Sequence, residues 1–205
     1  MDTLLPAFSL PTLPTELGWH IPPLDWSLSP GKALSIQAGP KTDLFNDPAG
    51  TIVIDNAPCA LMTAPNPSFI LSAKVSVAFG ATYDAGALQI RVSDTLWAKL
   101  CFEYSPQGQP MVVSVVNRSV SDDCNSAVID GSEVYLRMAR TPRTIAFHYS
   151  TDGRTWHFVR YFSLGLTDVV RAGFSAQSPT GPQCRAVFSE ITYRAGALAD
   201  NRSGE

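Results

Sequence analysis

The chain has 205 residues, of which 45% are hydrophobic and 16% are charged, so it can bury a sizeable core and is not a mainly disordered chain. The formal net charge of −3 gives no support to nucleic-acid binding, which usually shows as a basic domain. No apolar run approaches the roughly 18 residues of a membrane-spanning helix.

The N-terminal segment is rich in proline and has no feature of a secretory signal peptide. Residues 1–14 carry a single charge, on Asp2, and it is negative, whereas a signal peptide begins with basic residues. We therefore expect a cytoplasmic protein. Because proline fixes φ and has no backbone donor, residues 6–23 should be extended. An edge strand there could be anchored by Trp19, Ile21, Leu24 and Trp26.

Farther along the chain, four segments alternate between apolar and polar side chains, which is the pattern of a strand with one buried face. They are residues 69–79, 96–104, 133–139 and 144–150. Within 96–104 the buried face should hold Leu96, Ala98, Leu100, Phe102 and Tyr104, and the other face Trp97, Lys99, Cys101 and Glu103. Turn signals such as Asp152-Gly153 separate the segments. The pattern predicts an all-β antiparallel sandwich, jelly roll or barrel.

We expect ligand chemistry on the strand faces that do not enter the core. Their side chains are Gln89, Arg91, Trp97, Lys99, Glu103, Ser114, Tyr135, Arg137 and His148. This mixture of aromatic and charged groups is typical of a polar site, where rings stack on a sugar and charged groups bind its hydroxyls. The alternative is that a loop covers Trp97 and that Lys99 and Glu103 form a surface ion pair.

The carboxylates allow an enzymatic hypothesis. Glycoside hydrolysis needs two acids, and Glu103 could pair with Asp122 or Asp123, in segment 119–125 interpreted as a loop, or with Asp84. No short motif joins them. We expect His148 to be a hydrogen-bonded polar residue rather than a base.

No cofactor or metal is predicted. Asp43, Asn46 and Asp47 could coordinate calcium, but they fall short of an EF-hand, and turn chemistry explains them more simply. The cysteines lack zinc spacing, and we expect four unpaired, buried or half-buried thiols. They are Cys59, Cys101, Cys124 and Cys184.

Several strings of residues resemble one family along nearly the whole chain, from about residue 17 to 194. They are YDAGAL (83–88), WAKLCFEY (97–104), VVSVVNRSVSDD (112–123), YLRMAR (135–140), HYSTDGRTWHFVR (148–160) and GFSAQSPTG (173–181), with TDLFNDPAG (42–50) and DNAP (55–58) in the N-terminal half. They are similar to the domain of unknown function 1349 family, which includes the yeast regulation of enolase protein 1.

The resemblance implies a concanavalin A-like jelly roll of roughly 12 strands with little helix, similar to the C-terminal sandwich of some family 43 β-xylosidases. The expected domains are a proline-rich extension (1–16), the sandwich (17–194) and a flexible tail (195–205). Recurrent polar positions of the family match Tyr83, Asp84, Trp97, Lys99, Glu103, Ser121, Asp122, Arg137, Arg140 and Gln177. Where the family often has Ser-Asp-Trp, this chain has Ser121-Asp122-Asp123, so an aromatic is replaced by a second carboxylate.

The leading hypothesis is non-catalytic binding of a carbohydrate-like or small polar ligand in a concave groove. Trp97 and Tyr135 would stack on it, Lys99, Arg137 and Arg140 would bind hydroxyls or an acidic group, and Glu103 and Asp122 would accept hydrogen bonds; Tyr83, Asp84 and Gln177 complete the expected site. The alternative is an enzyme acting on a sugar or polar metabolite, with Glu103 and Asp122 as acid and base. A third hypothesis is a regulatory protein-interaction module, with a protein partner or a homodimer, and no nucleic acid or membrane as partner.

Overall fold

The computed structural model describes residues 6–167 and 169–205, which form 16 strands and no helix. None of these residues belongs to a helix that could cross a membrane. The strands are β1 (Gly18–Ile21), β2 (Asp25–Leu28), β3 (Leu34–Ala38), β4 (Leu44–Asn46), β5 (Val53–Asp55), β6 (Cys59–Thr63), β7 (Phe69–Ala78), β8 (Ala85–Arg91), β9 (Leu96–Tyr104), β10 (Pro110–Arg118), β11 (Val120–Val128), β12 (Glu133–Arg140), β13 (Ile145–Ser150), β14 (His157–Phe162), β15 (Arg171–Gln177) and β16 (Cys184–Ala195).

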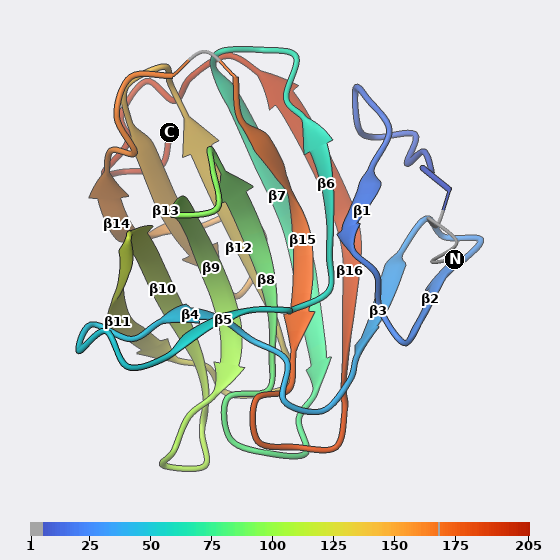
Figure 1. The fold of residues 1–205 in the computed structure, drawn as a ribbon. Coiled ribbons are helices and arrows are strands. Elements are labelled where there is room, and N and C mark those ends of the chain that lie inside the picture. Colours follow the sequence, from blue (N-terminus) through green and yellow to red (C-terminus); the bar gives the residue numbers. More distant parts are fainter. Residues whose placement is uncertain (1–5, 168) are drawn as a thin grey trace.

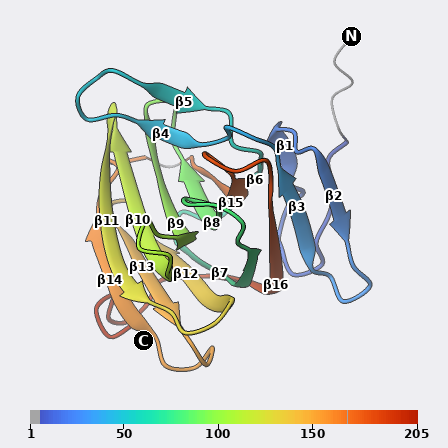
Figure 2. The same ribbon diagram turned by 90° about the horizontal axis from the view of Figure 1, so that it is seen from below.

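The strands form two antiparallel sheets of seven strands that pack face to face (Figure 1). The first sheet has the order β1-β6-β15-β8-β9-β10-β11 and the second β14-β13-β12-β7-β16-β3-β2. The hairpin β4–β5 crosses outside the first sheet, over β9 and β10 (Figure 2). The predicted all-β antiparallel sandwich is therefore confirmed. The 16 strands exceed the roughly 12 that the family resemblance implies, and they include short strands such as β4 and β5.

Alternation along the central strands builds the core between the two sheets. On β9, Ala98, Leu100 and Phe102 are buried in the main core, and their neighbours Lys99 and Glu103 lie on the outer face, as the sequence predicts. The hairpin expected at Asp152-Gly153 is also present, since β13 pairs with β14 and Gly153 has a φ of 71°. Ser114 differs, because it lies opposite Leu100 and so faces the core rather than the outer surface.

The segment 119–125 is a strand and not a loop. It belongs to β11, which pairs with β10 along the edge of the first sheet. Ser119, with a φ of 70°, makes the tight turn between the two strands. Polar residues are weak strand formers, but an edge strand with a free face tolerates them once backbone hydrogen bonds to a neighbour are available.

The two ends of the chain pack on the sandwich. Trp19 of β1 and Trp26 of β2 sit on edge strands of different sheets and gather around Phe8, with ring centroids 5.6 and 4.6 Å from it. Residues 1–5 of the predicted extension lie outside the described residues. At the other end, Asn201 and Gly204 accept hydrogen bonds from the second sheet at 2.8 and 2.7 Å, so the tail is docked rather than free.

Candidate ligand-binding site

The antiparallel register places the polar residues of the first sheet in rows across its outer face. In one row Gln89, Lys99, Val115 and Asp123 lie side by side on β8, β9, β10 and β11. The neighbouring row holds Arg91, Trp97, Asn117 and Ser121. Because side chains alternate along a strand, Asp123 faces this surface and Asp122 points to the other side of β11.

The β4–β5 hairpin, with its flanking residues 43–57, covers one end of this face, and we call this segment the flap. Trp97 is fully buried beneath it, packed against Leu44, Ala57 and Val115. Trp97 is therefore covered, as the alternative interpretation of the sequence held, and it offers no ring to a ligand. Stacking on Trp97 does not agree with this burial.

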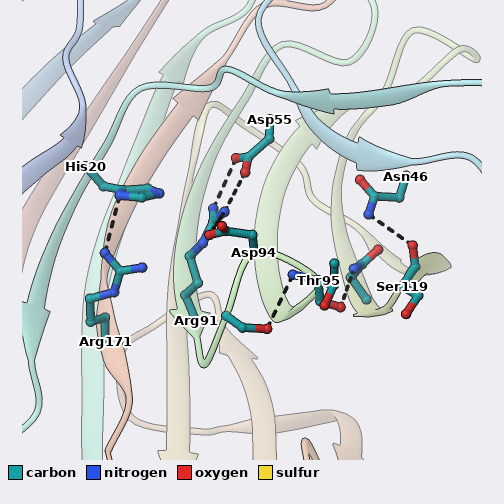
Figure 3. A network of polar contacts seen from close by, with 10 residues as sticks. His20, Asn46, Asp55, Arg91, Asp94, Thr95, Ser119 and Arg171 are labelled. Atoms are coloured by element: carbon teal, nitrogen blue, oxygen red, sulfur yellow. Dashed lines mark hydrogen bonds and ion pairs between the residues drawn. The ribbon is translucent and has the colours of Figure 1, made fainter.

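An ion-pair network fastens the flap to the sheet. The side chain of Arg91 is fully buried and donates to both carboxylate oxygens of Asp55, which ends the flap strand β5 (Figure 3). Asp94 accepts a further hydrogen bond from the same guanidinium at 3.0 Å, and it is largely exposed. Burial, the largest single influence, would lower the pKa of Arg91, but the hydrogen bonds and charges of Asp55 and Asp94 together outweigh it and the pKa is raised. Arg91 therefore stays charged and holds the flap electrostatically.

Beside the flap, the outer face forms a cavity of about 360 Å³. Its polar lining includes Asp43, Lys99, Glu103, Asp123 and Gln177. Its apolar lining includes Phe45, Tyr83 and Met111. Pockets of this size, with apolar walls and a few convergent polar groups, are typical of small-ligand sites. Four of the ten predicted positions meet here: Tyr83, Lys99, Glu103 and Gln177.

Lys99 forms the charged floor of the cavity. It is 3% exposed, and its ammonium donates to Asp43 Oδ1 at 3.2 Å and to Gln177 Oε1 at 2.7 Å. The Gln177 amide in turn donates to the Tyr83 carbonyl at 3.1 Å, which orients it. Burial opposes the charged form of Lys99, but Asp43, with smaller contributions from Cys101 and Glu103, more than offsets it, and the net pKa is raised. The partner of Lys99 is thus Asp43, and not Glu103 as in the surface ion-pair alternative.

Glu103 is the carboxyl group with the most altered acidity in the cavity. Burial raises its pKa to about 7, with Lys99 opposing that rise and Asp43 and Asp123 adding to it. No hydrogen bond joins its carboxyl to another described residue. Burial also raises the pKa of Asp123. The cavity therefore presents a carboxyl group that changes charge near neutral pH, and it can donate or accept a hydrogen bond there.

Two of the predicted acids have other roles. Asp84 is fully buried outside the cavity, where it accepts hydrogen bonds from Gly80 N and Ala81 N at 2.9 Å and from Ser178 Oγ at 2.7 Å. It thereby fixes the loop before β8. Asp122 is exposed and paired with Arg160 of β14 at 2.7 Å, so it links the edges of the two sheets. The structure does not bring Asp122 together with Glu103 on one surface.

The three remaining predicted residues lie on the second sheet. Tyr135 and Arg137 are on its outer face, on the opposite side of the sandwich from the cavity. Arg140 is buried and donates to the Pro67 carbonyl at 2.6 Å and to the Thr167 carbonyl. His148 is buried and neutral, with a pKa lowered by burial to about 4, and its ring Nε2 meets the Asn201 carbonyl. This matches its expected role as a hydrogen-bonded polar residue.

The sequence did not point to several cavity residues. Asp43 and Phe45 come from the flap, whose packing on the sheet is a contact between distant segments, and the sequence suggests Asp43 only as a calcium ligand. Asp47, from the same group, accepts hydrogen bonds from Ala49 N and Thr51 within its own turn. No group of three or more acids, histidines or cysteines in the described part of the chain is placed to hold a metal ion. Cys59, Cys101 and Cys184 are buried free thiols and Cys124 is an exposed one.

Two packed antiparallel sheets with a covered polar cavity on one outer face define a β-sandwich protein of the jelly-roll class. The chain belongs to the family described as "Protein of unknown function (DUF1349)", whose profile matches residues 19–195. This confirms the family resemblance stated from the sequence. A search of curated proteins gives no match to the chain.

Solved structures with the same fold extend the comparison. A functionally unknown protein from Saccharomyces cerevisiae has a TM-score of 0.82 at 21% identity, over 89% of this chain and 97% of that one. The GH43 protein BlXynB from Bacillus licheniformis has a TM-score of 0.68 at 18% identity, over 83% of this chain and 34% of that one. An alginate lyase from Klebsiella pneumoniae has a TM-score of 0.52 at 13% identity, over 84% of each chain. At these identities the likeness shows the fold alone.

Proposed function

We propose that the protein binds a carbohydrate-like polar ligand, without transforming it, in the cavity on the outer face of the first sheet. The observation that carries this proposal is the lining of the cavity, where aromatic and apolar side chains alternate with convergent polar groups. Sugars present apolar ring faces and hydroxyl edges, and a lining of this kind complements both.

The roles of the residues follow from their positions. Phe45 and Tyr83 offer the ring surfaces for stacking, in place of Trp97 and Tyr135, which the sequence predicts for this role. Asp123 and Glu103 accept hydrogen bonds from hydroxyl groups, and Glu103 donates one when it is protonated. Lys99 and Asp43 form an ion pair, so together they add no net charge to the floor of the cavity.

The structural neighbours support this choice of ligand class by analogy. They include a GH43 protein and an alginate lyase, and the name of the lyase states an action on alginate, a sugar polymer. This chain spans about a third of the GH43 protein, so the activity of that whole protein does not transfer with the fold.

The test is a binding screen of neutral and acidic sugars, followed by calorimetry on variants of two adjacent residues. Asp123→Asn removes a cavity carboxylate, and Asp122→Asn is the matched control because it faces the other side of the same strand. We expect the first to weaken binding about tenfold, the usual scale of one charged hydrogen bond, and the second to leave it unchanged. No sugar binding by the wild type up to about 10 mM, or equal effects of the two variants, would overturn the proposal.

One observation favours catalysis as a second function. A carboxyl group with a pKa of about 7 suits a general acid at neutral pH, and Glu103 has that value. The partner expected from the sequence, Asp122, is engaged by Arg160, and Asp43 is paired with Lys99, so Asp123 is the second acid that we assign to this reaction. In this case Glu103→Gln would abolish release of reducing sugar while sugar binding persists. Absence of product from the wild type would leave binding as the function.

The other expectations from the sequence stay predictions. They are a cytoplasmic location, no nucleic-acid or membrane partner, and a protein-interaction role with a protein partner or a homodimer.

A further inference from the structure

The outer face of the second sheet carries a groove of about 510 Å³, on the opposite side of the sandwich from the cavity on the first sheet. Its floor is Arg137 of β12, which is 7% exposed. The guanidinium stacks on Trp156, with its central carbon 4.1 Å from the ring centroid. Stacking of this kind fixes the plane of the guanidinium and therefore the direction of its N–H groups.

Arg137 is a buried cation without an acidic partner among the described residues. Its Nη2 donates to the Gly204 carbonyl at 2.7 Å, and its Nε has no hydrogen-bond partner there. None of the ion pairs between the residues that the structure describes includes Arg137. Burial and the charge of nearby Arg194 lower its pKa to about 10. A buried charge normally has a counter-charge, so the groove is electrostatically incomplete.

The groups around Arg137 would complete a site for an anion. Thr192, Ser72 and Arg137 lie side by side in one row across β16, β7 and β12. The two hydroxyl oxygens are 2.7 Å apart, and Arg194 lies two residues beyond Thr192 on the same face. Two cations beside two hydroxyl groups are the donors that a carboxylate or phosphate group requires.

The acid in this groove does not supply the missing charge. Glu190 accepts a hydrogen bond from Tyr135 Oη at 3.0 Å and lies 4.0 Å from the Lys74 ammonium. These contacts hold it at the Tyr135 end of the groove, away from Arg137. We propose that the groove binds a small oxyanion, the carboxylate or phosphate group of a polar metabolite, between Arg137 and Arg194.

The experiment follows the indole N–H resonance of Trp156 in a ¹⁵N-labelled full chain, assigned with Trp156→Phe. The probes are inorganic phosphate, glucose 6-phosphate and glucuronate, with glucose as the uncharged control. We expect the anions to shift the Trp156 resonance and glucose to leave it in place, with an affinity that falls as salt increases. Whichever of glucose 6-phosphate and glucuronate binds more tightly identifies the anionic group as phosphate or carboxylate.

Two variants with the same change in charge separate a site from a general electrostatic effect. Arg194→Gln removes an exposed groove arginine, and Arg185→Gln removes one on the same strand that pairs with Asp25 far from the groove. We expect about a tenfold weaker affinity for the first and no change for the second. A Trp156 resonance that stays unmoved up to about 10 mM anion, or equal effects of both variants, would overturn the proposal. Asp123→Asn should leave this titration unchanged, so its outcome is independent of sugar binding.

Discussion

Glu103 and His148 couple the stability of the fold to pH in opposite directions. Burial raises the pKa of Glu103 to about 7, so between its usual value and 7 the folded chain keeps a proton that the unfolded chain releases. The free energy of unfolding therefore falls as pH rises through this range. Burial lowers the pKa of His148 to about 4, so between the usual histidine value and 4 the unfolded chain binds a proton that the folded chain does not bind. The contribution of His148 to the free energy of unfolding is therefore lost as pH falls from the usual histidine value towards 4.

We predict that Glu103→Gln removes the first of these effects. The variant should gain stability relative to the wild type as pH rises from 5 to 8, by about 1–3 kcal/mol, because the cost of ionising a partly buried carboxyl disappears. Urea denaturation of both proteins at the two pH values measures the difference. An equal difference at both values would show that Glu103 has an ordinary pKa in the folded state.

At the scale of elements, the flap depends on a buried charge. We predict that Asp55→Ala destabilises the fold by about 3 kcal/mol, because it leaves the buried Arg91 guanidinium without its main partner. Asp94→Ala is the matched control and should cost less than about 1 kcal/mol, since Asp94 is exposed. Thermal unfolding compares them, and hydrogen exchange of residues 44–55 should rise in the first variant alone. Similar losses in both would contradict this role of the flap.

The docked tail depends on a glycine. Gly204 has a φ of 82°, and a Cβ there would lie 2.4 Å from Arg137 Nη2 and 3.1 Å from Trp156 Cβ. We predict that Gly204→Val releases residues 198–205, because a branched side chain fits neither the backbone conformation nor the space. Limited proteolysis should cut this tail faster in the variant, whereas Glu205→Val, which changes the exposed side chain of the next residue, should behave as the wild type. An unchanged cleavage rate in Gly204→Val would mean that the tail is held by other contacts.

Elements with a regular hydrophobic pattern could be predicted from the sequence, and the segments that cover them could not. Alternation on β9 places Lys99 and Glu103 on an outer face correctly, because period two is a local property of a strand. The pattern does not tell which sheet a face belongs to, so it cannot separate Tyr135 and Arg137 from Lys99, although they lie on the other side of the sandwich. The covering of Trp97 by the flap is a contact between distant segments and leaves no local signal.

At the scale of the whole molecule, each sheet is completed by a strand from the end of the chain. β15 lies between β6 and β8 in the first sheet, and β16 lies between β3 and β7 in the second. We predict that a chain ending at residue 167 does not fold, because both sheets would lose a central strand and with it the pairing of their two halves. Circular dichroism and amide dispersion in NMR spectra would show this. A cooperative unfolding transition in the truncated chain would contradict it.

The same arrangement governs how the protein can fold as it is made. β6, β7 and β8 leave the ribosome long before the strands that will lie between or beside them. Their backbone edges stay unpaired and their apolar faces stay exposed during most of synthesis. Pairings between residues so far apart in sequence form slowly, and exposed strand edges favour association between chains. Native structure should therefore appear only after the last strand is released, which makes the nascent chain a natural client for chaperones that shield apolar segments.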